Sequence, residues 1–180
     1  MSRTFGATRS AAPVDGERRE SMTEKQVIRR QRPRRAGSSD YEVRRVCGEE
    51  EMAAVLAVRH EVFCLEQGVP EHEEVDGRDR EALHLVALAD GELVGTCRLL
   101  MVGSTAQFSR LAVKDSARRR GIASALLEAA EHESRAAGAR RVVLHAQTYA
   151  RGLYDRAGFQ PRGRPFVEAG IQHIAMEKQL

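Results

Sequence analysis

An arginine-rich loop lies between a short apolar segment and an amphipathic helix, and its residue types suit the binding of phosphate. Arg118, Arg119 and Arg120 precede Gly121, and apolar residues recur at helical spacing from Ile122. The first N–H groups of a helix have no intrahelical partner, so they can donate to an anion, which a glycine allows to approach the backbone. Arginine side chains add positive charge. The sequence predicts a phosphate site at the start of this helix; a solvated helix start is the alternative.

The spacing Arg118-x-x-Gly121-x-Ala123 resembles the acyl-CoA-binding signature of the GCN5-related N-acetyltransferases (the GNAT family), which reads Arg or Gln, two residues, Gly, one residue, and Gly or Ala. The segment 152–159 is similar to the family's aromatic-Tyr-x-x-x-Gly-Phe motif, with Leu153 in place of the usual aromatic residue. The finer pattern resembles a bacterial subgroup, the ElaA-like and YjcF-like acetyltransferases, in segments 62–67, 84, 95–98, 146–147 and 170–173.

The resemblance implies acetyl-CoA as cosubstrate, no metal, and a small-molecule amine as acceptor. Main-chain groups of the strand around Ala112 would bind the pantetheine arm through hydrogen bonds that a β-bulge leaves free. Main-chain N–H groups of residues 119–124 would hold the pyrophosphate. The cofactor-binding residues implied are Leu111, Ala112, Val113, Arg118, Arg119, Arg120, Gly121, Ile122, Ala123, Ser124 and Gln147.

Candidates for acid and base chemistry follow from the same resemblance. Tyr154 matches the family tyrosine near the cofactor sulfur, where a phenol can protonate the departing thiolate; a core tyrosine is the alternative. Glu66 could accept the amine proton directly or through water, or be a helix-end residue without a role. His145 shares a strand face with Gln147 and could be a base or a structural group. A water relay without a dedicated base also stays open.

An acidic loop follows the first predicted helix and offers a second resemblance. Residues 74–79, with Arg59, Phe63 and residues 98–100, resemble the N-terminal half of the acyl-homoserine-lactone synthases, which share the fold but lack a clear match to residues 118–123. This is a minor alternative. The loop carboxylates could meet a cationic amine or be simply hydrated. The candidate substrate residues are Glu74, Asp76, Asp79, His84, Arg98 and His173.

Hydrophobic periodicity predicts an α+β layered fold, with a mostly antiparallel mixed sheet of about six or seven strands flanked by helices. The resemblance implies the same order of elements, so the expected fold is of the GNAT type. The helix expected first ends before Gly68 and Pro70, and Asp90-Gly91 suits a hairpin turn. The expected strands are 41–46, 84–89, 93–101, 107–114, 141–147, 159–164 and 171–177, and the expected helices are 49–66, 122 to about 138, and 151–157.

The 180 residues divide into a basic extension and one domain. Residues 1–40 hold ten Lys and Arg against five Asp and Glu, a net charge of +5, whereas 41–180 hold 19 against 21. We expect residues 1–40 to be disordered and 41–180 to form the acetyltransferase domain. Translation from Met22 is an alternative to translation from Met1. The arginines of 29–35 could touch nucleic acid, but a solvated tail is preferred because no aromatic residue lies among them.

Two further expectations concern location and assembly. Three scattered cysteines and the lack of a long apolar run or leader indicate a reduced, cytoplasmic protein that does not associate with a membrane. A homodimer is possible by family resemblance.

Beside the enzyme, a catalytically inactive CoA-binding sensor and a nucleic-acid-docking adaptor of the same fold remain alternative functions.

Overall fold

The computed structural model describes residues 41–180, so the expectations for 1–40 lie outside the described residues. The order of elements agrees with the sequence prediction. The strands are β1 (Tyr41–Arg45), β2 (Leu83–Ala89), β3 (Glu92–Val102), β4 (Thr105–Val113), β5 (Arg141–Gln147), β6 (Gln160–Glu168) and β7 (Ile171–Gln179). The helices are α1 (Gly48–Arg59), a π-helix (His60–Glu66), α2 (Glu71–Glu74), α3 (Ile122–Ala136) and α4 (Arg151–Arg156).

The strands form one seven-stranded sheet in the order β1-β2-β3-β4-β5-β7-β6. All neighbouring strands are antiparallel except β4 and β5. The turn between β2 and β3 needs positive φ at both central residues, and Asp90 and Gly91 have φ of 52° and 83°. The prediction of a mostly antiparallel α+β fold is therefore confirmed.

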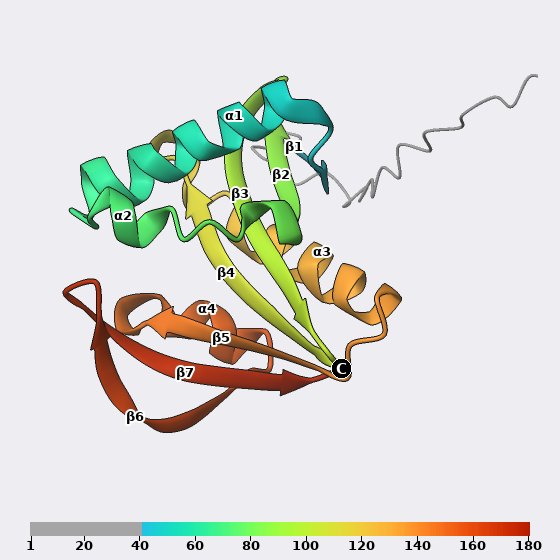
Figure 1. Cartoon of the computed structure of the whole chain (residues 1–180), viewed down its shortest axis with the longest axis vertical. Coiled ribbons are helices and arrows are strands. Elements are labelled where there is room, and N and C mark those ends of the chain that lie inside the picture. The colour runs from blue at the N-terminus through green and yellow to red at the C-terminus, as the bar shows by residue number, and fades with distance from the viewer. Residues whose placement is uncertain (1–40) are drawn as a thin grey trace, which may run out of the picture.

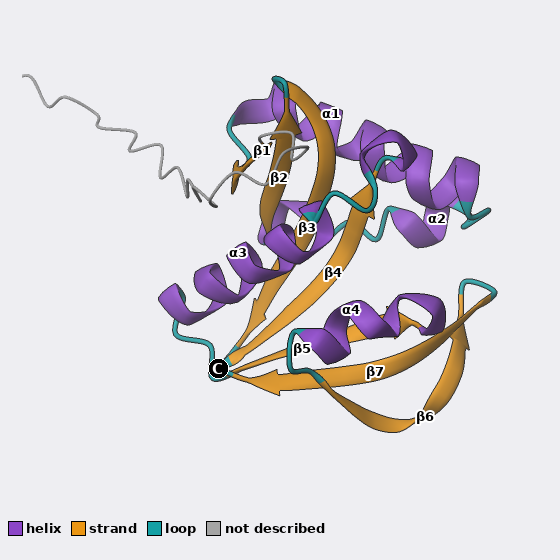
Figure 2. Cartoon of the chain, turned by 180° about the vertical axis from the view of Figure 1, so that it is seen from behind, coloured by secondary structure: helices purple, strands orange, loops and turns teal. Residues whose placement is uncertain are grey.

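Helices cover both faces of the sheet. Helices α1 and α2 lie over the face that is in front in Figure 1, and α3 and α4 lie over the opposite face, seen in Figure 2. Leu126 and Ile122 of α3 are almost fully buried against the sheet and form the main core with Leu85, Phe108 and their neighbours. A smaller cluster packs Val58 and Val62 onto Ala112 of β4.

Strands β4 and β5 separate soon after they begin. They pair only where residues 105–107 lie beside residues 141–143, and beyond these positions the sheet opens between them (Figures 1 and 2). On its other side, β4 carries a bulge. Arg110 and Leu111 lie opposite the single residue Cys97 of β3, and Arg110 has a φ of 55°. This bulge confirms the one expected from the family resemblance.

Three local features differ from the prediction. The helix expected over 49–66 continues to Glu66, but as a π-helix after Arg59. Helix α2 was not predicted. Strand β6 extends to Glu168, beyond the expected end at residue 164, although nearly all of its residues are exposed. Within residues 41–180, no helix has both the length and the apolar character needed to cross a membrane.

Candidate active site

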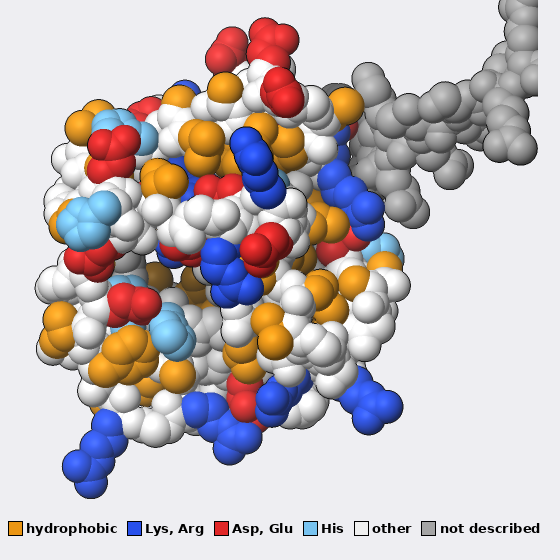
Figure 3. All heavy atoms as spheres, viewed as in Figure 1, with side chains coloured by type: hydrophobic (Ala, Val, Ile, Leu, Met, Phe, Trp, Pro, Cys, Tyr) orange, Lys and Arg blue, Asp and Glu red, His pale blue; other side chains and the backbone are white. Residues whose placement is uncertain are grey.

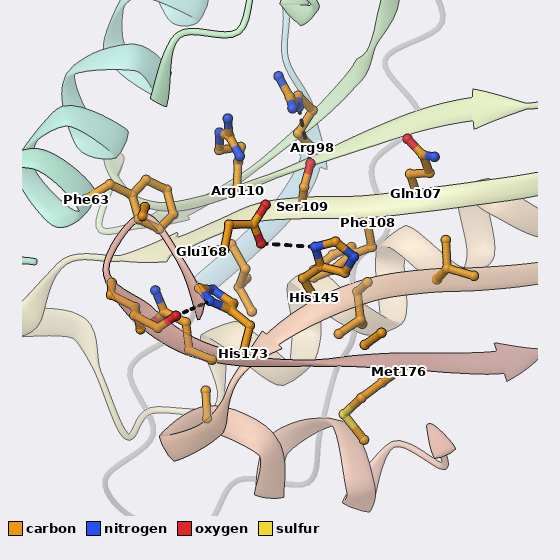
Figure 4. Close-up of a pocket in the computed structure, with 18 of the residues that line it drawn as sticks. Phe63, Arg98, Gln107, Phe108, Ser109, Arg110, His145, Glu168, His173 and Met176 are labelled. Carbon is orange, nitrogen blue, oxygen red and sulfur yellow. Dashed lines mark hydrogen bonds and ion pairs between the residues drawn. The ribbon is translucent and has the colours of Figure 1, made fainter. Parts of the chain in front are cut away.

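A cavity of about 680 Å³ opens on the front face, where β4 and β5 have separated. Figure 3 shows a hollow on this face with acidic and histidine side chains around it. Its walls come from the π-helix, the loop after α2, strands β3, β4, β5 and β7, and the end of β6. Figure 4 shows labelled side chains from these elements around the cavity. The site is therefore built between the two halves of the sheet.

The predicted phosphate site lies at the start of α3. Gly121 is the N-cap residue, with a φ of 85° that L side chains rarely adopt, and no side chain caps the helix. Ala125 N–H donates to Gly121 O (3.0 Å), so the N–H groups of residues 122–124 precede the first bond of the helix. The Nε and Nη2 atoms of Arg120 are buried without a hydrogen-bond partner among the described residues. These free donors fit a diphosphate.

Arg118 and Glu66 form an ion pair next to this corner. The Arg118 guanidinium also donates to Val113 O and Asp115 Oδ1, each at 3.0 Å. Arg118 therefore holds the loop to the end of β4 and to the end of the π-helix. Glu66, proposed from sequence as a base, has its carboxylate engaged with Arg118 and does not line the cavity.

Tyr154 is a core residue that also lines the cavity. Its ring is buried and packs edge-on against Phe108 and Phe159, with ring centroids 6.4 and 6.0 Å away. The same residue lines the cavity. Burial of the phenol raises the pKa of Tyr154, so the hydroxyl keeps its proton at neutral pH. A core tyrosine that also lines the cavity can serve as a proton donor.

Gln147 is part of an amide bridge across the open end of the sheet. Its Nε2 donates to Gln67 Oε1 (2.9 Å), and the hydroxyl of Tyr149 donates to its Oε1. The bridge joins the end of β5 to the end of the π-helix, and all three residues line the cavity. Gln67 and Tyr149 were missed from sequence, where nothing links residues 80 positions apart.

His145 and His173 both line the cavity, whereas His84 does not. His145 Nδ1 bonds to Glu168 Oε2 (3.0 Å), and His173 Nδ1 donates to Ile171 O (2.9 Å). These contacts are drawn in Figure 4. His84 is buried and its Nε2 bonds to Asp79 O at 3.0 Å. Burial lowers the pKa of His84, which fits a neutral structural imidazole.

The acidic-loop residues proposed to meet a substrate already have arginine partners. Asp76 binds Arg98 through both oxygens, at 2.7 and 2.6 Å. Asp79 lies 3.0 Å from Arg98 and 2.7 Å from Arg59, which also pairs with Glu74. Part of this arginine–carboxylate network, Glu74, Asp76 and Arg98, lines the cavity, and each of these carboxylates is paired with an arginine.

A mixed sheet that opens between two parallel strands, a bulge on one of them and a glycine-capped helix after it define an acyltransferase fold. A family model described as an acetyltransferase (GNAT) domain matches residues 42–180. The chain therefore belongs to the GNAT acetyltransferase family.

Among the described residues, no group of three or more His, Cys, Asp or Glu side chains is placed to hold a metal ion.

Three relatives support this assignment. The N-acetyltransferase YjcF of Bacillus subtilis is 34% identical over 131 residues, which are 72% of this chain and 94% of YjcF. The structure of an acyl-CoA N-acyltransferase from Pseudomonas aeruginosa is 31% identical, with a TM-score of 0.68 over 77% of this chain and 98% of its own. The structure of Escherichia coli ElaA has 23% identity and a TM-score of 0.69 over 78% of this chain and 99% of its own. The predicted resemblance to YjcF and ElaA is confirmed.

Proposed function

We propose that the protein is an acetyl-CoA-dependent N-acetyltransferase, which moves an acetyl group to the primary amine of a small molecule by direct attack in a ternary complex. The observation that carries this proposal is the opening between β4 and β5, because residues of both strands line the 680 Å³ cavity and the glycine-capped start of α3 follows β4 in the chain. The names of YjcF and of the Pseudomonas aeruginosa protein, an N-acetyltransferase and an acyl-CoA N-acyltransferase, support the same chemistry.

The residues on both sides of this opening fit the parts of acetyl-CoA. The free N–H groups of residues 122–124 and the buried donors of Arg120 suit its pyrophosphate. Backbone groups at the bulge of β4 suit the pantetheine arm. Bound acetyl-CoA supplies the thioester carbon, and Tyr154 holds the proton that the departing sulfur requires. The 680 Å³ cavity is large enough for a small amine.

A catalytically inactive CoA-binding sensor is the second candidate. Its cofactor site would be the same, so binding alone does not distinguish the two functions. The cavity beyond the opening favours the enzyme, because its wall carries two histidines and Tyr154, groups that can move protons. The nucleic-acid adaptor depends on the arginines of 29–35, which lie outside the described residues.

The cofactor site is tested by matched substitutions at the two ends of α3. Gly121 and Gly138 have similar φ, 85° and 81°, so Glu at either position carries a similar backbone strain. We expect acetyl-CoA at 100 times its dissociation constant to stabilise the wild type by about 2.7 kcal/mol, which raises its Tm by several degrees. Gly138→Glu should retain this Tm shift and Gly121→Glu should lose it. A wild type whose Tm is unchanged by millimolar acetyl-CoA would contradict the proposal.

The reaction is tested by release of free CoA with a panel of amines: ethanolamine, glucosamine, spermidine and glycine methyl ester. We expect at least one amine to accelerate thiol release from acetyl-CoA, and mass spectrometry should find it acetylated. Gly138→Glu should keep this activity, whereas Gly121→Glu should not. A clear Tm shift together with no acetylated amine in this panel or a broader one would favour the sensor.

A further inference from the structure

A histidine and a glutamate lie together at the point where the sheet opens. His145 is two residues beyond Val143, which is the last residue of β5 paired with β4. Successive side chains of a strand point to opposite faces, so His145 shares a face with Val143 and Gln147, and all three line the cavity. Glu168 reaches the same cavity from the end of β6. Figure 4 shows the two side chains directed toward one another.

The contact with Glu168 fixes the tautomer of His145. A carboxylate only accepts hydrogen bonds, so the Nδ1 atom of His145, 3.0 Å from Glu168 Oε2, carries the proton. In a neutral imidazole the other nitrogen is then an acceptor. Within residues 41–180, Nε2 of His145 has no hydrogen-bond partner, and the side chain is 54% exposed. The free lone pair is thus accessible from the cavity.

The ring of His145 is also held in place by packing. Phe166 contacts it edge-on, with centroids 4.9 Å apart, and stacks on His173 at 6.1 Å. Residues 166 and 173 pair across β6 and β7, so this aromatic contact is built into the strand register. His173 is more deeply buried than His145. Of the two histidines, His145 therefore has the more accessible free nitrogen.

Resting on the proposed function, we propose that His145 is the general base of the acetyl transfer and that Glu168 is its positioning residue. As the amine nitrogen forms its bond to the thioester carbon, its proton passes to Nε2 of His145. The carbon–sulfur bond breaks, and the sulfur takes a proton from Tyr154. Glu168 keeps its hydrogen bond to Nδ1 and stabilises the imidazolium. Solvent then returns Tyr154 and His145 to their starting protonation states.

The structure favours His145 over Glu66 for this role. Glu66 is bound to Arg118 and lies outside the cavity wall, whereas His145 lines the cavity and its Nε2 has no hydrogen-bond partner within residues 41–180. The other titratable or charged side chains of β6 and β7 that line this part of the cavity are Arg162, Glu177 and His173. Arg162 and Glu177 pair with each other, and Nδ1 of His173 is bonded to backbone. Glu168 is thus the charged group bonded to His145.

The test compares His145→Gln and Glu168→Gln with two control variants that change exposed residues far from the cavity, His132→Gln on α3 and Glu92→Gln on β3. The probe is the panel amine that gives the fastest thiol release. We expect His145→Gln to lower kcat about 10²- to 10³-fold. Glu168→Gln should lower kcat about 10- to 100-fold, the range of a lost charged hydrogen bond. Glu168→Asp should recover part of the loss. Both controls should match the wild type.

Two readouts separate base chemistry from folding and from cofactor binding. The Tm shift produced by acetyl-CoA should be the same in His145→Gln and the wild type. An error about the role of His145 would leave this shift and the acetylation of amines intact in the wild type, whereas an error about the proposed function would remove one of them. Log kcat/KM should rise with pH in both enzymes, because the amine must be neutral to attack, and kcat of His145→Gln should stay below that of the wild type at every pH. Activity of His145→Gln within about threefold of wild type across pH would overturn the proposal. The proposal would also be overturned if His145→Gln lost both its activity and the Tm shift with acetyl-CoA, because the substitution would then have disturbed cofactor binding.

Discussion

Tyr154 is packed in the core, and we propose it as the proton donor of the reaction. Its ring fills space between Phe108 and Phe159, which fixes the direction of the hydroxyl. Burial raises the pKa of the phenol, so the proton stays on oxygen until a strong base such as a thiolate forms nearby. The same packing that stabilises the fold therefore keeps the phenol protonated at the cavity, as the proposed role requires.

Replacing Tyr154 with Phe tests the hydroxyl apart from the ring. We expect Tyr154→Phe to lower kcat about 10²-fold, because the leaving sulfur loses its proton donor. The phenyl ring should keep its contacts with Phe108 and Phe159, so the Tm and the Tm shift with acetyl-CoA should change little. Steady-state thiol release and thermal unfolding measure the two effects. Turnover equal to wild type would remove Tyr154 from the chemistry.

At residue scale, the sequence predicted the parts of the site that are contiguous in the chain. Gly121 and the arginines before it form one motif and Tyr154 lies in another, so the resemblance of these motifs to those of the GNAT family pointed to them. Glu168 was missed because its partner His145 is 23 residues away, and nothing in the sequence pairs them. Pairing of side chains across strands depends on register, which apolar patterns fix only approximately.

At the scale of elements, the apolar runs and turn residues predicted most strands because burial sets their pattern. The π-helix was not predicted, because Val55, Val58 and Val62 keep a spacing that an α-helix also satisfies. Its wider turns lead to Gln67, which reaches the cavity together with Phe63. Insertions of this kind are frequent at functional sites. The local backbone form, invisible in the sequence, thus helps to shape the site.

The position of α3 depends on a glycine in β3. A Cβ at Gly95 would lie 3.2 Å from Ala112 O, 3.2 Å from Ile122 Cγ2 and 3.3 Å from Leu126 Cδ1. We expect Gly95→Ala to lower the free energy of unfolding by about 1 to 3 kcal/mol, because α3 must move away from β3 and β4. The start of α3 moves with it, so acetyl-CoA should bind more weakly.

The control for this substitution is Gly103→Ala in the turn between β3 and β4. There an added Cβ meets nothing within 4 Å, although the φ of 57° strains the backbone. Gly103→Ala should lose some stability and keep its affinity for acetyl-CoA. Thermal unfolding and isothermal titration measure both quantities. If Gly95→Ala binds acetyl-CoA as tightly as Gly103→Ala does, the packing of α3 against β3 does not determine the affinity for acetyl-CoA.

At the scale of the molecule, the arginine–carboxylate network joins segments distant in sequence. Arg59 comes from α1, Arg98 from β3 and Arg110 from the bulge of β4, and together they hold the end of α2 and the loop after it. Arg59 is fully buried, and its charge is matched by Glu74 and Asp79. The sequence showed these charges as an acidic loop and as scattered arginines. Only the fold reveals that they neutralise each other and build one wall of the cavity.

This network makes stability depend on pH through Asp76. Its hydrogen bonds with Arg98 hold the pKa of Asp76 well below its usual range, and Arg59 and Arg98 lower the pKa of Asp79 although burial opposes them. A depressed folded-state pKa adds stability above the unfolded value of about 3.9, and this stability is lost as pH falls through the folded-state pKa. At pH 7 we expect Asp76→Asn to be less stable than wild type by about 3 kcal/mol, because Arg98 is almost fully buried.

The difference between wild type and Asp76→Asn should be constant above about pH 5 and shrink as the pH falls further, since protonated Asp76 resembles asparagine. Asp155→Asn, which removes an exposed i,i+4 pair with Arg151, should change stability by about 0.5 kcal/mol or less at any pH. Urea unfolding between pH 7 and pH 3 measures each value. A difference that stays constant down to pH 3 would mean that the charge of Asp76 does not stabilise this wall. The stability of this wall would then depend on the other pairs of the network, those of Arg59 with Glu74 and Asp79.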